Sequence, residues 1–124
     1  MNTVFADSYL WLAVVNTRDA GHARALQFLE GFDGRMVTTE AVLLEVADAL
    51  AVSPAGRAEF ATLEADLRAD ASVEIVSFTS ALFHRAVVLY CGRSDKKWSL
   101  TDCISFTVMQ EMGLTDALTA DHHF

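Results

Sequence analysis

Short apolar runs alternate along the chain with longer segments in which apolar residues recur every three or four positions. The short runs are typical of strands buried in a sheet, and the three-to-four spacing is typical of amphipathic helices. The expected strands are Thr3–Ala6, Met36–Val37, Val73–Phe78 and Asp116–Thr119. Helices are expected over residues 8–15, 22–30, 39–50, 53–70, 80–90 and 100–112.

Polar residues and glycines mark the expected helix ends. Ser8, Asp19 and Thr39 stand where a side chain can accept the first free N–H groups of a helix. Pro54 suits the first turn of the fourth helix, and Gly113 suits the residue that closes the last one. The alternation of strands and helices predicts an α/β fold with four to five short strands in a mainly parallel sheet covered on both faces. A length of 124 residues fits one domain spanning residues 1–124.

Four acidic residues stand beside apolar residues instead of on solvated faces. Asp7 ends the first strand and Asp121 follows the last, so both are expected at the carboxyl edge of one sheet. Glu45 borders the apolar stripe of the helix after the second strand, and Asp102 lies in the first turn of the last helix. Carboxylates that converge repel one another, and a hard divalent cation such as Mg²⁺ relieves that repulsion. The pattern therefore indicates an acidic metal site.

Each of these acids also has a purely structural interpretation. Asp7 can cap the first helix, and Glu45 can lie at the rim of an amphipathic one. Ser99 and Asp102 match a capping box, while Asp121 can belong to an ordinary turn. The pattern alone therefore supports no more than an α/β domain with a possible acidic metal site.

Four local sequences carry a resemblance to a known family. They are Phe5-Ala6-Asp7-Ser8, the run from Thr38 to Ala47, the run from Trp98 to Phe106, and the run from Ala117 to Phe124. In this order they resemble the PIN-domain family, and within it the VapC-type toxins, over nearly the whole chain. The resemblance implies a three-layer α/β/α sandwich that binds Mg²⁺ or Mn²⁺ and cuts RNA phosphodiesters.

The resemblance also assigns roles to single residues. It implies that Asp7, Glu45, Asp102 and Asp121 are both the catalytic residues and the metal ligands. Serine or threonine near such acids supports the site in the family, and the matching positions are Ser8, Thr38 and Thr119. Relatives usually continue beyond the His–Phe pair with a short tail, whereas this chain stops at Phe124.

The same resemblance implies two protein partners. VapC-type toxins form homodimers and are silenced by a cognate antitoxin that lays a helix beside the active site. The start of the chain lacks a basic segment followed by an apolar one, and no apolar run reaches the roughly 18 residues of a membrane span. A cytoplasmic protein without a membrane segment is therefore expected.

The charge balance is unusual for a protein that binds RNA. The chain has 9 basic and 17 acidic residues, for a net charge of −8. Contacts to phosphate still require local positive charge. Arg93, Lys96 and Lys97 precede Asp102 and are the expected RNA-binding residues, while Trp98 either stacks on a base or anchors the loop.

Other functions were weighed against the nuclease. A catalytically inactive PIN-like module that binds RNA or protein is the main alternative; the four acids argue against it and the missing tail argues for it. A signalling receiver domain needs a lysine after a late strand, and the only lysines are Lys96 and Lys97 in a loop. A haloacid-dehalogenase-type phosphatase needs a second aspartate where Tyr9 stands. His122 and His123 offer a Zn²⁺ or Mn²⁺ site, although adjacent residues rarely face one ion.

Overall fold

The computed structural model describes residues 2–118. The four strands are β1 (Thr3–Ala6), β2 (Arg35–Thr39), β3 (Val73–Val76) and β4 (Ala117–Leu118). The helices are α1 (Ser8–Val15), α2 (His22–Gly31), α3 (Glu40–Leu50), α4 (Pro54–Ala69), α5 (Ser80–Gly92) and α6 (Leu100–Met112). None of the helices in this described part has the length and apolar character needed to cross a membrane.

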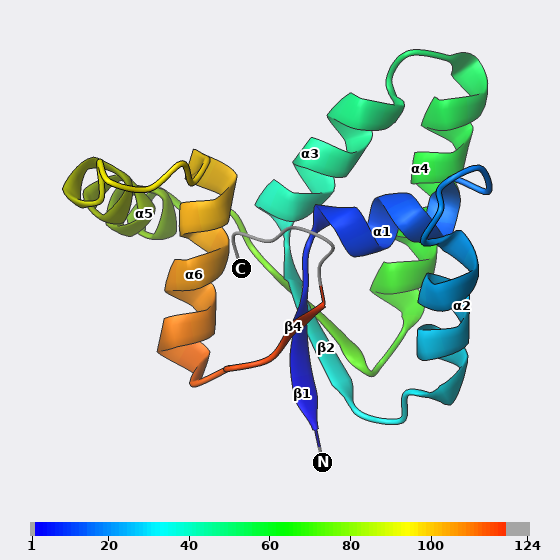
Figure 1. The fold of residues 1–124 in the computed structure, drawn as a ribbon, viewed down its shortest axis with the longest axis horizontal. Coiled ribbons are helices and arrows are strands. Elements are labelled where there is room, and N and C mark those ends of the chain that lie inside the picture. Colours follow the sequence, from blue (N-terminus) through cyan, green and yellow to red (C-terminus); the bar gives the residue numbers. More distant parts are fainter. Residues whose placement is uncertain (1, 119–124) are drawn as a thin grey trace.

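The four strands form one sheet in the order β3-β2-β1-β4, and neighbouring strands are all parallel. Helices α5 and α6 lie on one side of this sheet and α1 to α4 on the other (Figure 1). The expected α/β class with a parallel sheet between helices is therefore confirmed. Because the strands are parallel, their carboxyl ends meet at one edge, where β1 leads into α1 and β2 into α3.

Three strands differ from the expected ones, and the smallest difference is that β4 begins at Ala117 instead of Asp116. Strand β2 is longer than Met36–Val37, because it pairs with β1 on one side and with β3 on the other. Strand β3 ends at Val76 and stops short of Phe78. The backbone N–H of Phe78 donates to Glu40 Oε1 at 2.8 Å, so this residue belongs to a connection fastened to the start of α3.

The caps of the first two helices also differ from the expectation. Asp7, and not Ser8, caps α1: its Oδ1 accepts the backbone N–H groups of Tyr9 at 3.0 Å and Leu10 at 3.4 Å. Asp19 does not cap α2, because it accepts the N–H of Gly21 in the turn before the helix. An aspartate binds the backbone two residues ahead as readily in a turn as at a helix start, so sequence alone did not separate the two.

The predicted caps at Thr39, at the start of α4 and at Gly113 are confirmed, whereas α2 runs one residue and α5 two residues beyond the expected ends. Thr39 accepts the N–H of Val42 at the start of α3, and Ser53 accepts that of Gly56 at the start of α4. Gly113 closes α6 with a φ of 68°, a left-handed conformation that glycine adopts without a Cβ clash. These caps fix where α3 begins and where α6 ends, and both helices carry a candidate acid.

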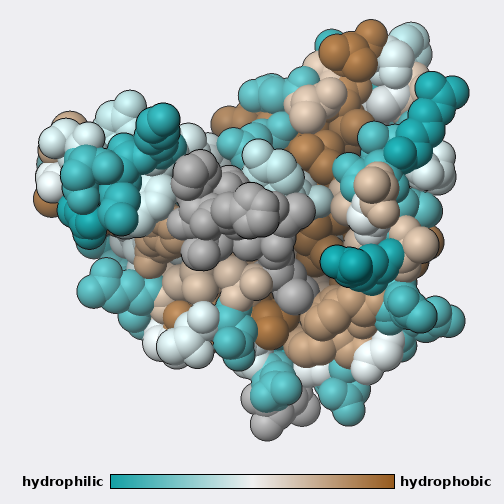
Figure 2. Space-filling model, viewed as in Figure 1, coloured by the Kyte–Doolittle hydropathy of each residue, from teal (hydrophilic) through white to brown (hydrophobic). Residues whose placement is uncertain are grey.

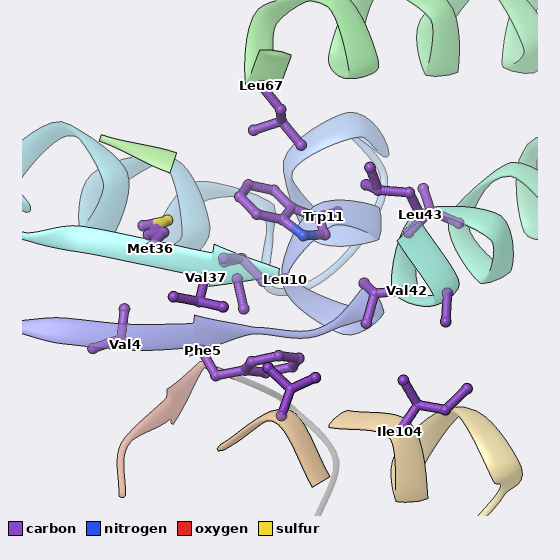
Figure 3. Packing of buried hydrophobic residues seen from close by; sticks show 14 of the residues in the cluster. Val4, Phe5, Leu10, Trp11, Met36, Val37, Val42, Leu43, Leu67 and Ile104 are labelled. Carbon is purple, nitrogen blue, oxygen red and sulfur yellow. The ribbon is translucent and has the colours of Figure 1, made fainter. Parts of the chain in front are cut away.

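The core lies on both faces of the sheet. Phe5 and Ile104 lie on one side of β1, while Trp11 and Leu67 lie on the other (Figure 3). Phe5 and Trp11 are buried almost completely, at 0% and 1% exposure. Burying large side chains of this kind contributes roughly 1.5–3 kcal/mol each, so both helix layers are held firmly against the sheet.

The start of α3 is also held by an acidic side chain. Glu40 accepts the Phe78 N–H through one oxygen and pairs with Arg68 of α4 at 3.1 Å through the other. The Phe78 N–H, and after it the hydrogen bond from Arg68, hold the pKa of Glu40 below its ordinary value. The helix that carries Glu45 is therefore tied to α4 and to the β3–α5 connection at its first residue.

Candidate active site

Two of the expected acids share one pocket at the carboxyl edge of the sheet. Glu45 of α3 and Asp102 of α6 both line this hollow of about 330 Å³. The other lining residues come from α1, α3 and the start of α6: Ser8, Tyr9, Leu12, Ala49, Lys97 and Ser99. Three segments far apart in the sequence therefore meet here, as the parallel topology requires.

A serine joins the first of these segments to the second. The buried Ser8 hydroxyl donates a hydrogen bond to Glu45 Oε1, across 37 positions of sequence. Because Asp7 is the cap, Ser8 occupies the first turn of α1 and its side chain points at α3 instead of at its own backbone. The bond directs one carboxylate oxygen of the half-buried Glu45 toward α1 and fixes the orientation of the group.

Asp7 lies next to this serine but does not line the pocket. It is 4% exposed, and its Oδ1 accepts the two N–H groups at the start of α1. Asp7 therefore has the structural role of a helix cap. Both of these bonds go to the same oxygen of the carboxylate.

Asp102 likewise has its structural role. Ser99 Oγ accepts the N–H of Asp102, and Asp102 Oδ2 accepts the N–H of Ser99, both at 3.0 Å. This reciprocal pair is the capping box that the sequence suggested. It orients the half-buried carboxylate at the start of α6 and still leaves it on the wall of the pocket.

The donors of the pocket are mainly oxygens. Glu45, Asp102, Ser8 and Ser99 offer carboxylate and hydroxyl oxygens, which suit Mg²⁺ or Mn²⁺ better than softer ions. Cys103 follows Asp102, but burial, and to a smaller extent the negative charge of Asp102, raise the pKa of its thiol. Among residues 2–118, no three acidic, histidine or cysteine side chains gather closely enough to form a metal site by themselves.

The edge of the sheet beneath the pocket depends on the hydroxyl of Thr38. This side chain is fully buried; it donates to the carbonyl of Ala6 at 2.8 Å and accepts from Trp11 Nε1 at 3.2 Å. It therefore joins β2 to the end of β1 and to α1, directly before Asp7. Thr38 contacts no acid through these bonds, and its support of the site is indirect.

The sequence analysis did not identify Trp11 as part of this arrangement. Trp11 stands among apolar residues in α1, and nothing in that pattern distinguished a core indole from one whose N–H has a partner. A buried indole N–H needs a hydrogen-bond acceptor, so the sequence could indicate that Trp11 has a partner but could not identify it as Thr38.

Of the three basic residues before Asp102, one lies at the pocket and two lie over a tryptophan ring. Lys97 lines the pocket, whereas Arg93 and Lys96 lie over the ring of Trp98, at 5.1 and 5.7 Å from its centroid. Trp98 packs edge-on against Phe106 with 4.7 Å between ring centroids, which bears out the anchoring interpretation of this residue. The expected residues Thr119, Asp121, His122 and His123 lie outside the described part of the chain.

Comparison with protein families gives one match that spans almost the whole chain. The model of the PIN domain matches residues 4–124. No curated protein sequence is similar enough to match.

Solved structures share the fold at low sequence identity. VapC20 of Mycobacterium tuberculosis, described as a sarcin–ricin loop cleaving toxin, superimposes with a TM-score of 0.84 at 24% identity, covering 95% of this chain and 89% of that one. A toxin–antitoxin complex from Klebsiella pneumoniae gives 0.67 at 18% identity, with 95% and 86% covered. VapBC2 of Rickettsia felis, bound to a promoter DNA fragment, gives 0.66 at 13% identity, with 97% and 89% covered.

Replacing Thr38 by valine tests the buried hydroxyl. Valine keeps the shape but leaves the Trp11 N–H without its acceptor, so the free energy of unfolding is expected to fall by about 1–3 kcal/mol. Thr38→Ser keeps the hydroxyl and is expected to lose less. Urea unfolding followed by circular dichroism measures both variants. Equal stability of Thr38→Val and the unmodified protein would show that the hydroxyl does not hold this edge.

Proposed function

Because this chain belongs to the PIN domain family, we propose that it is a metal-dependent endoribonuclease and the toxin of a VapBC-type toxin–antitoxin pair. The observation that carries the proposal is the meeting of Ser8, Glu45 and Asp102 in one pocket, at the position where β1 delivers Asp7. The match over residues 4–124 supports treating residues 1–124 as one domain with this single site.

The proposed ion is Mg²⁺ or Mn²⁺, held by Glu45 and Asp102 together with Asp7 and Asp121. Within the described residues each of the first two uses one oxygen in its structural bond, Glu45 Oε1 with Ser8 and Asp102 Oδ2 with Ser99. The second oxygen of each carboxylate is then the one available to a cation. When bound, such an ion polarises a phosphoryl oxygen and lowers the pKa of a water molecule.

The protein's own residues position the reacting groups. Ser8 holds Glu45, so that its carboxylate stays oriented before substrate arrives. The capping box does the same for Asp102. Lys97 adds a positive charge at the pocket wall, where an RNA phosphate approaching two carboxylates needs one. Orientation before binding removes part of the cost of reaching the transition state.

The substrate that we propose is RNA, with a structured loop as the first to try because VapC20 is described as cleaving the sarcin–ricin loop. The purified chain is expected to cut labelled RNA with Mg²⁺ or Mn²⁺ and to stop with EDTA. Glu45→Gln and Asp102→Asn should each lower the rate about 100-fold or more, since each removes charge at the reacting phosphate. Denaturing gels of end-labelled RNA measure the rates.

The two variants are chosen to keep the fold. Glutamine at position 45 can still accept from Ser8, and asparagine at position 102 can still accept the N–H of Ser99, so only the negative charge is lost. Glu30→Gln, an exposed acid of α2, makes the same change away from the site and should cleave normally. Unchanged cleavage by both site variants, or cleavage that EDTA leaves intact, contradicts the nuclease. RNA binding without any cleavage by folded protein favours the inactive binding module.

A groove beside the pocket supports an antitoxin partner. Two hollows continue from the pocket along α1, one between α1 and the α3–α4 connection and one between α1 and α4. Their apolar lining includes Leu12, Val15 and Leu63, and their acidic lining is Asp19, Glu59 and Asp66. No lysine or arginine of the described chain lines either hollow. Figure 2 shows hydrophobic residues in this region, around α1, α3 and α4.

An apolar groove with acidic walls suits an amphipathic helix that carries basic residues.

In cells that express the chain with the antitoxin encoded beside it, growth should be normal. Glu59→Lys with Asp66→Lys should release the toxin and slow growth, because like charges then meet across the groove. Glu30→Lys is the matched control. Normal growth with the double variant would place the antitoxin elsewhere. Homodimer formation stays a prediction.

A further inference from the structure

The loop of residues 93–99 between α5 and α6 carries positive charge to the active site. It holds Arg93, Lys96 and Lys97, a third of the chain's 9 basic residues. Lys97 lines the pocket beside Glu45 and Asp102, whereas the groove on the other side of that pocket is walled by acids. Charge therefore favours an approach of RNA phosphates from the loop side.

Trp98 holds the loop in place. Its ring packs on Phe106 of α6, and Arg93 and Lys96 both lie over it. A cation over an aromatic ring loses conformational freedom but keeps its N–H groups available at the rim. Arg93 is 43% exposed, so its guanidinium is both positioned and accessible to solvent.

Arg93 also forms a two-pronged bond to a neighbouring acid. Its Nε donates to Asp95 Oδ1 at 3.0 Å and its second donor nitrogen to Oδ2 at 3.1 Å. The hydrogen bonds from Arg93 hold the pKa of the Asp95 carboxyl below its ordinary value, so the acid is charged at neutral pH. The planar fork of an arginine binds two phosphate oxygens with the same geometry. The same two donor nitrogens can therefore bind either Asp95 or a phosphodiester.

We propose that Arg93 is a phosphate-binding residue for RNA and that Asp95 occupies it in the free protein, as an internal competitor. The inference rests on the proposed ribonuclease function and adds that the Arg93–Asp95 pair limits RNA binding. An RNA phosphate must displace Asp95 before it can bind Arg93, so nonspecific binding of RNA is weakened. Exposed ion pairs add little to stability, and the fold does not depend on this pair. Asp95 acts through Arg93 and is a positioning residue.

The test measures RNA affinity apart from cleavage. A Glu45→Gln background prevents cutting, and fluorescence anisotropy with a labelled single-stranded RNA gives Kd over a range of salt concentrations. Asp95→Asn is expected to lower Kd about three- to tenfold. Arg93→Gln is expected to flatten the slope of log K against log salt by about 0.7, the value for one phosphate contact on a single strand.

A double variant separates this mechanism from a simple change of net charge. With Arg93→Gln already present, Asp95→Asn should change Kd less than twofold, because the residue it acts through is gone. Asp33→Asn, an exposed acid before β2, makes the same charge change far from the loop and should have little effect. An equal gain in the Arg93→Gln background, or no gain at all, overturns the proposal. A protein that binds as expected but cuts no RNA contradicts the nuclease alone.

Discussion

The candidate site depends on one buried hydroxyl. Thr38, on β2, has no exposed surface, and its two hydrogen bonds reach the last carbonyl of β1 and the indole of Trp11 on α1. Without that hydroxyl, an indole N–H would be buried without a partner, a cost of about 1–3 kcal/mol. In the described residues every buried side-chain polar atom has a partner. The position of Asp7 and Ser8 follows from this junction, and the orientation of Glu45 follows from Ser8.

The structural role of the acids is compatible with the functional role that we propose for them. Asp7 caps α1, and Asp102 completes the capping box of α6 by accepting the N–H of the cap residue Ser99. A cap fixes the carboxylate against the backbone, and a fixed carboxylate is also what a metal site requires. The caps therefore give these acids their orientation at the edge of the sheet. Among the candidate acids within residues 2–118, Glu45, in the second turn of α3, differs because the side chain of Ser8 from another helix holds it.

Residue type and spacing predicted the class of sheet and most helix ends, but they did not predict the side-chain bonds between residues distant in sequence. The parallel sheet, the caps Thr39 and Ser53 and the close of α6 at Gly113 follow from residue type and spacing, and all were found. The cap of α1 was placed one residue late, because Asp7 and Ser8 are both good caps and only the fold decides between them. The Ser8–Glu45 and Trp11–Thr38 bonds join residues distant in sequence, and no pattern of spacing could reveal them.

The proposed nuclease requires a divalent cation where β1, α3 and α6 meet. Paramagnetic broadening by Mn²⁺, in nuclear magnetic resonance spectra of the ¹⁵N-labelled protein, detects such a site without relying on cleavage. Substoichiometric Mn²⁺ is expected to broaden first the amide signals around Ser8, Glu45 and Asp102. The effect should vanish in a variant that combines Glu45→Gln with Asp102→Asn. Broadening spread over surface acids such as Glu30 and Asp33, or unchanged in the double variant, would contradict the proposed site.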